Sequence, residues 1–166
     1  RPPIKGIFLS NGNTYHDTAI FDIDQPQAEG KERGLHHFAL ELETEAEMCE
    51  ADARIGEYGF EFDNYRSADV AHSCYGRDPD GNRFEVYADV KEYWRDERSG
   101  DIDQPEMNPV WEPGLTLPVA EPCYPVDPEI SVIEDAVFHT RRAAHLAIVA
   151  EDYEGLHDHY TKLVGL

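Results

Sequence analysis

A tight-turn sequence, Asp-Pro-Asp-Gly-Asn at residues 78–82, divides two strand-like segments in the middle of this 166-residue chain. Proline fixes φ and glycine accepts a positive φ, so this sequence favours a turn over a helix. We therefore expect strands at 72–77 and 83–88. Because side chains alternate along a strand, Glu85 should face away from its apolar neighbours in the second strand. The turn thus directs a carboxylate to the polar side of a hairpin.

A strand-to-helix segment precedes this hairpin. Residues 35–43 alternate, with three apolar side chains on one face and His37 on the other. A helix should follow at once, because Thr44 with a glutamate three positions later is a capping-box pattern. A further strand is expected near 60–62. Residues 35–89 therefore predict the order β-α-β-β-β.

The two ends of the chain carry further elements. Residues 4–9 and 14–23 predict a hairpin around an Asn-Gly-Asn turn. Residues 144–150 predict a strand, and residues 152–164 predict a helix with an aspartate cap and a glycine stop. The two ends together give β-α-β-β, one strand fewer than the central segment.

Composition restricts the classes of partner. The formal charge is −21, from 35 acidic and 14 basic residues, so nucleic acid and anionic membranes are poor partners. Concentrated counterions would screen this charge, which predicts a halophilic protein in a salt-rich cytoplasm. The three cysteines show no Cys-x-x-Cys spacing, which argues against a disulfide framework and a thiolate zinc site. No signal peptide or membrane span is recognised, so we expect a soluble cytoplasmic protein.

Three motifs carry a resemblance to a known family. They are Leu-His-His-Phe-Ala-Leu-Glu-Leu-Glu-Thr at 35–44, Tyr-x-x-Asp-Pro-Asp-Gly-Asn-x-x-Glu-Val-Tyr at 75–87, and His-x-x-x-x-x-x-Asp followed by His-Tyr-Thr-Lys-Leu-Val-Gly-Leu at 145–166. Through them the chain resembles the vicinal oxygen chelate superfamily, and most closely its type I extradiol catechol dioxygenases, over residues 4–89 and 137–166. The resemblance implies an α+β fold in which paired β-α-β-β-β modules form a curved, barrel-like mixed sheet with helices outside.

The resemblance also implies an order of modules. Residues 1–166 would form a single domain, with a complete module at 35–89 and an irregular, proline-rich acidic segment at 90–142. Residues 143–166 followed by 1–23 would form the second module. In the family the half with the first metal histidine comes first, whereas here it comes last, so the order is circularly permuted. The alternative is a piece of a longer tandem array that completes its core with a partner chain, as in a domain-swapped dimer.

Two histidines and one glutamate on separate predicted strands could form a 2-His-1-carboxylate metal site. The resemblance places the metal histidines at His37 and His145 and the carboxylate ligand at Glu85. Strand alternation independently turns each of these side chains away from the apolar face. His139 remains a weaker alternative to His145.

The resemblance implies two further site residues. The acid-base histidine of the family falls on His16, and its substrate-binding tyrosine falls on Tyr75. The family carries a second active-site histidine in the loop before the strand that contains Tyr75, and this histidine has no match here. His72 or Arg66 could reach the same space.

Together with the resemblance, these residues imply an iron(II) enzyme, with manganese(II) as the alternative metal. It would act as an extradiol-type, catechol 2,3-type dioxygenase on a small catecholic aromatic substrate and O2, with the metal as Lewis acid and template. A glyoxalase- or isomerase-like metalloenzyme and a metal-free, drug-sequestering module remain alternatives. We expect a homo-oligomer, possibly a domain-swapped dimer, without nucleic acid or membrane partners.

Overall fold

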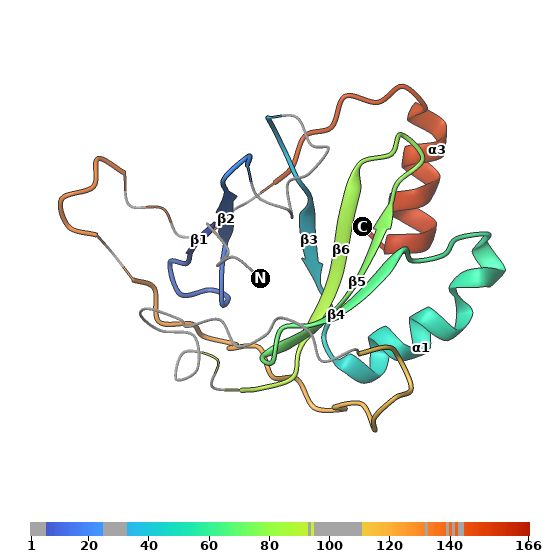
Figure 1. Cartoon of the computed structure of the whole chain (residues 1–166), viewed down its shortest axis with the longest axis horizontal. Helices are drawn as coiled ribbons and strands as arrows, with labels where there is room; N and C mark the ends of the chain where they lie inside the picture. Colours follow the sequence, from blue (N-terminus) through green and yellow to red (C-terminus); the bar gives the residue numbers. More distant parts are fainter. Residues whose placement is uncertain are drawn as a thin grey trace. The chain divides into compact units, whose positions relative to one another are not determined.

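The computed structural model describes residues 6–24, 33–92, 94, 111–131, 133–138, 140, 142 and 145–166 (Figure 1). The chain forms two compact units. Unit 1 consists of residues 1–36 and 125–146, and unit 2 consists of residues 37–124 and 147–166. Several predictions fall on residues outside the described ones. They concern His139, residues 95–110 of the irregular segment expected at 90–142, and the first residues of the strands expected to begin at 4 and 144.

Unit 2 contains a four-stranded mixed sheet. Its strands are β3 (Phe38–Glu41), β4 (Asn64–Ser67), β5 (Ala71–Arg77) and β6 (Arg83–Asp89), in the spatial order β3-β6-β5-β4. Strand β3 runs parallel to β6, whereas the β6-β5 and β5-β4 pairs are antiparallel. With its two helices this sheet confirms the α+β prediction, although the strands of the described part do not close into a barrel.

The predicted strand near 60–62 is wrong, because β4 begins only at Asn64. Phe60 and Phe62 instead pack over the sheet beside Phe84, with ring centroids 5.8 and 6.4 Å from that ring. Gly76 leaves the space for them, since a Cβ atom there would lie 2.5 Å from Cζ of Phe60. The two aromatic residues therefore cover the apolar face and do not extend the sheet.

Helix α1 (Glu45–Ile55) begins as the capping box predicted, with the backbone N–H of Glu47 donating to Oγ1 of Thr44 at 3.1 Å. It continues into a short 3-10 turn, η2 (Gly56–Tyr58). The helix buries Met48 against the apolar face of the sheet, and burial of such a side chain contributes about 1.5–3 kcal/mol. The buried residues of this core are Met48, Cys74, Phe84, Val86, Ala88 and Trp111.

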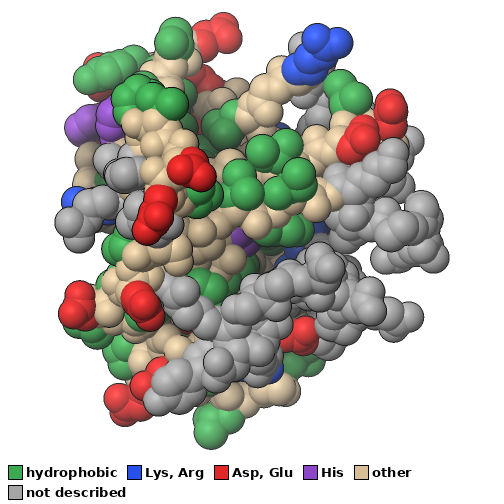
Figure 2. Space-filling view, turned by 90° about the vertical axis from the view of Figure 1, so that its left-hand side faces the viewer, with side chains coloured by type: hydrophobic (Ala, Val, Ile, Leu, Met, Phe, Trp, Pro, Cys, Tyr) green, Lys and Arg blue, Asp and Glu red, His purple; other side chains and the backbone are tan. Residues whose placement is uncertain are grey.

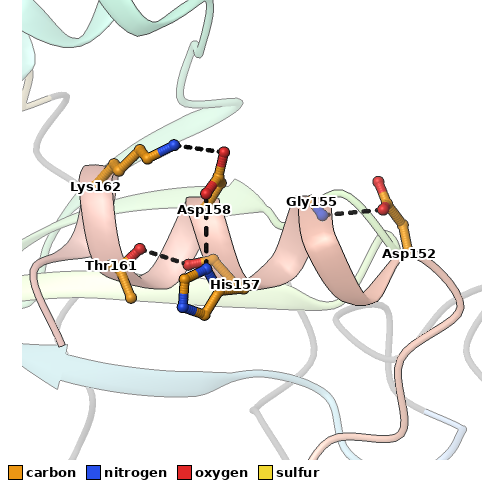
Figure 3. A network of polar contacts seen from close by, with 6 residues as sticks. All are labelled: Asp152, Gly155, His157, Asp158, Thr161 and Lys162. Carbon is orange, nitrogen blue, oxygen red and sulfur yellow. Dashed lines mark hydrogen bonds and ion pairs between the residues drawn. The ribbon is translucent and has the colours of Figure 1, made fainter.

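The C-terminal helix is also present where it was predicted. Helix α3 (Tyr153–Asp158) continues into a π-helical segment, η3 (His159–Val164). Figure 3 shows its polar contacts: Asp152 accepts the backbone N–H of Gly155 at 2.9 Å, and Lys162 Nζ lies 2.6 Å from Asp158 Oδ2. In Figure 1 both α1 and α3 lie on the same side of the sheet of unit 2. Ser73, Tyr75 and Glu85 lie on the opposite side of the sheet.

The 78–82 turn attaches α3 to the sheet. The carboxylate of Asp78 accepts a hydrogen bond from the hydroxyl of Tyr160 at 2.8 Å. The carboxylate of Asp80 accepts the backbone N–H groups of Glu151 and Asp152 at 2.6 and 2.9 Å. The turn therefore caps the start of α3, a role that its sequence alone did not indicate.

The predicted strand at 144–150 is wrong for its described part. Residues 145–150 are irregular and pair with none of the described strands. Val149 is 99% exposed, so the apolar alternation of this segment does not reflect burial in the structure. An extended segment becomes a strand only when a neighbouring backbone accepts and donates its hydrogen bonds.

Unit 1 contains the predicted N-terminal hairpin in a shorter form. Strands β1 (Gly6–Leu9) and β2 (Thr18–Phe21) pair antiparallel. The turn between them is closed by Asp17, whose carboxylate accepts the backbone N–H of Asn11 at 2.8 Å. Asn11 also bonds to Ser131 and Thr140, so the hairpin holds the 125–146 segment of the same unit.

Acidic side chains are spread over the face seen in Figure 2, whereas lysine and arginine side chains are sparse there. The thiols of all three cysteines are free. None of the helices in the described part of the chain is long and apolar enough to span a membrane.

Candidate metal and substrate site

The register of the sheet in unit 2 brings His37, Tyr75 and Glu85 together. Glu85 on β6 lies opposite Tyr75 on β5 and beside Ala39 on β3, two residues after His37. Nε2 of His37 lies 3.0 Å from Oε2 of Glu85. The rings of His37 and Tyr75 meet edge to face, with centroids 5.6 Å apart. Strand alternation therefore places these three predicted site residues on one face.

Glu85 is a buried carboxylate with several hydrogen-bond donors. Its exposed fraction is 4%. Burial acts to raise the pKa of Glu85, but hydrogen bonds from His37, Ser73 and Tyr75 outweigh burial and lower it below the ordinary value. The side chain is thus held ionised, which is the form that a metal ligand requires.

Tyr75 is surrounded by charged groups. Burial, the negative charge of Glu85 and the hydrogen bond to that carboxylate all raise the pKa of the Tyr75 phenol. Its hydroxyl therefore stays protonated and can donate a hydrogen bond. The guanidinium carbons of Arg83 and Arg66 lie 4.8 and 5.6 Å from the centroid of the Tyr75 ring.

We refer to these side chains as the polar face, which consists of His37, Arg66, Ser73, Tyr75, Arg83 and Glu85. Ser73 and Arg83 were not singled out from the sequence. Each lies two positions before Tyr75 or Glu85 in its strand, so the same alternation could have identified them. Arg66, on β4, lies opposite Ser73 on β5.

His72 lies on the other face of the sheet. Its ring stacks on Trp111 at a centroid distance of 4.3 Å, and its Nδ1 atom lies 2.6 Å from Oε1 of Glu45. Glu45 also accepts the backbone N–H of Val119 at 2.8 Å. His72 therefore fastens the 111–119 segment to α1, and it does not take the place of the missing loop histidine.

The remaining predicted site residues belong to unit 1. His16 is half-buried between two rings, with centroids 5.1 Å from Phe8 and 4.5 Å from Tyr15. His145 is exposed. Among the described residues there is no group of three or more His, Cys, Asp or Glu side chains that could hold a metal ion. The roles of His16 and His145 thus stay predictions.

The donors that do meet fit a divalent metal of the first transition row. An imidazole nitrogen and an ionised carboxylate are adjacent, and such mixed nitrogen and oxygen donors suit iron(II) or manganese(II). The hydroxyls of Ser73 and Tyr75 bond to Glu85 and can orient it, as outer-shell partners of metal ligands commonly do. His37 and Glu85 would supply two of the protein ligands.

Comparison with known proteins gives one partial likeness. A catechol-2,3-dioxygenase of Bacillus subtilis (strain 168) is 40% identical over 68 residues, which make up 40% of this chain and 24% of that protein. The match therefore spans about a quarter of the relative. No family model and no solved structure matches. The likeness agrees with the resemblance to the vicinal oxygen chelate superfamily but does not test the permuted order of modules.

Proposed function

We propose that this chain acts as a metal-dependent extradiol-type dioxygenase, which opens a catecholic ring with O2 and uses iron(II), or alternatively manganese(II). The observation that carries the proposal is the buried, ionised Glu85 at 3.0 Å from His37, beside the protonated hydroxyl of Tyr75. The partial likeness to a catechol-2,3-dioxygenase supports the same reaction class.

In this proposal a divalent metal, when bound, supplies Lewis acidity and a template for two adjacent substrate oxygens. His37 and Glu85 hold it, and His145 is the proposed third ligand. Tyr75 donates its hydroxyl hydrogen to a substrate oxygen, because its phenol stays protonated. His16 takes a proton from a substrate hydroxyl and later returns one, a role suited to an imidazole.

Protein loaded with iron(II) without oxygen and then exposed to O2 and catechol tests the proposal. The expected result is the yellow ring-opened product, which His37→Ala and Glu85→Gln should abolish. His157→Ala is the matched histidine control, since that exposed side chain on α3 pairs only with Asp158 in the described part of the chain. Glu57→Gln, on the exposed η2 turn, is the matched carboxylate control.

Full occupancy by iron without cleavage of any member of a broad catechol panel would contradict the dioxygenase assignment. The isomerase-like alternative on an α-hydroxycarbonyl would then take its place. Failure to bind any metal would leave only the small-molecule-binding module.

A further inference from the structure

Two arginine side chains flank Tyr75 on the polar face. The guanidinium of Arg83 lies 4.8 Å and that of Arg66 lies 5.6 Å from the ring centroid of Tyr75. Arg66 pairs with Ser73 across the β4-β5 ladder, and Arg83 lies two residues before Glu85 on β6. Both cations therefore lie on the same face as the proposed metal ligands.

This placement is unusual because the chain has 35 acidic residues and 14 basic residues, so acidic partners are abundant. Nevertheless Arg66 forms no hydrogen bond or ion pair with any residue that the structure describes. Among the described residues Arg83 has one ion-pair partner, Asp63, at 3.8 Å, and its Nε atom is buried there without a hydrogen-bond acceptor. The half-buried guanidinium of Arg66 is therefore the group suited to an acceptor that arrives with a ligand.

The planar fork of a guanidinium group matches the two oxygens of a carboxylate. His37 and Glu85 define the end of the face at which the catechol hydroxyls would bind. Arg66 and Arg83 stand beside the ring of Tyr75 on the same face. One planar ring could therefore present hydroxyls to His37 and Glu85 and an anionic group to Arg66.

We propose that Arg66 binds the carboxylate of the substrate, so that the chain selects aromatic acids and its preferred substrate is a catechol that carries a carboxylate group. The claim that the substrate is a catechol rests on the proposed function. The contact between arginine and carboxylate does not.

Binding of benzoate and of neutral benzamide to the purified protein tests the carboxylate contact without requiring metal or turnover. Chemical-shift titrations at one fixed salt concentration measure both affinities. We expect benzoate to bind at least about tenfold more tightly than benzamide, as for a charge-assisted hydrogen bond. In Arg66→Gln this preference should disappear, with benzoate weakened by about ten- to hundredfold. Equal binding of the two ligands, or unchanged benzoate affinity in the variant, would overturn the proposal.

Arg54→Gln is the charge-matched control, because Arg54 is an exposed residue in the last turn of α1, on the opposite side of the sheet. It should keep the preference for benzoate. Arg66→Lys keeps the charge without the planar fork and should fall between the wild type and Arg66→Gln. If Arg66→Gln fails to fold, as judged by circular dichroism, Arg66→Lys and the wild-type comparison of the two ligands still decide the proposal.

Turnover separates this inference from the proposed function. Faster cleavage of 3,4-dihydroxybenzoate than of catechol by the iron-loaded protein would support both. Selective benzoate binding without cleavage of any catechol would sink the dioxygenase assignment and leave the carboxylate contact intact. Cleavage of catechol without any preference for the acid would support the dioxygenase assignment and overturn the carboxylate contact.

Discussion

Replacement of Asp89 by asparagine should stabilise the protein near neutral pH and have little effect in acid. Asp89 ends β6 and is only 3% exposed. Neither of its carboxylate oxygens has a hydrogen-bond partner among the described residues. Burial and the negative charge of Glu41 raise the pKa of Asp89 from 3.8 to about 7. The folded protein therefore holds this proton more tightly than the unfolded chain does.

The sign of the effect follows from this difference. A group with a raised pKa in the folded state contributes stability below its unfolded pKa, and that stability is lost as pH rises toward its folded pKa. The free energy of unfolding should thus fall between about pH 4 and pH 7. A shift of about three pKa units corresponds to at most roughly 4 kcal/mol. Asparagine stays neutral at all these pH values, so the variant should not show this loss.

Urea unfolding at pH 4, 6 and 8 in a constant concentration of potassium chloride measures the effect. The free energy of unfolding of Asp89→Asn should exceed that of the wild type most at pH 8, by up to roughly 4 kcal/mol. This difference should disappear toward pH 4. Glu57→Gln removes the same charge from an exposed turn and controls for general repulsion. A variant that is less stable than the wild type at pH 8, or a gap that is constant with pH, would refute the reasoning.

Three other predictions follow from the sequence and the structure. His16→Ala should reduce catechol turnover by ~10²–10⁴ with unchanged metal content, and unaltered turnover would remove His16 from the reaction. Gly76→Ala should cost about 1–3 kcal/mol in urea unfolding, because the new Cβ would lie 2.5 Å from Cζ of Phe60; an unchanged midpoint would show that the ring moves aside freely. Dilution from molar to millimolar salt should lower the melting temperature because the −21 charge is then unscreened, and a salt-independent melting temperature would contradict the halophilic interpretation.

Local sequence signals predicted the elements that depend on neighbouring residues. The capping box at Thr44 gave the start of α1, and the turn at 78–82 gave the β5-β6 hairpin. Alternation along the second strand gave the face of Glu85, whereas Tyr75 was identified through the family resemblance. Such signals act within a few residues, so they can be read without knowledge of the tertiary structure.

The two wrong strand predictions concern segments whose conformation depends on packing against residues distant in the sequence. Phe60 and Phe62 have the composition of a strand, but the space above Gly76 makes them a cover for the core. Residues 145–150 alternate like a strand, yet they pair with none of the described strands.

Two contacts between side chains of different elements were also not predicted from the sequence. His159 is 8% exposed and lies against Phe60 and Phe84, which no helical pattern indicated. On the polar face, the contact between Arg83 and the ring of Tyr75 on β5 was not predicted. Phe60 and Phe84 lie far from His159 along the chain, whereas the register of the β5-β6 hairpin brings Arg83 to Tyr75.

Metal stoichiometry tests the central claim most directly. Protein reconstituted with iron(II) without oxygen, dialysed and analysed for metal should retain one equivalent per chain, and X-ray absorption should show nitrogen and oxygen ligands only. His37→Ala, Glu85→Gln and His145→Ala should each lose the metal, whereas His157→Ala should keep it. Retention of a full equivalent by His37→Ala and Glu85→Gln would contradict the account, because the paired imidazole and carboxylate of unit 2 would then not be the metal site.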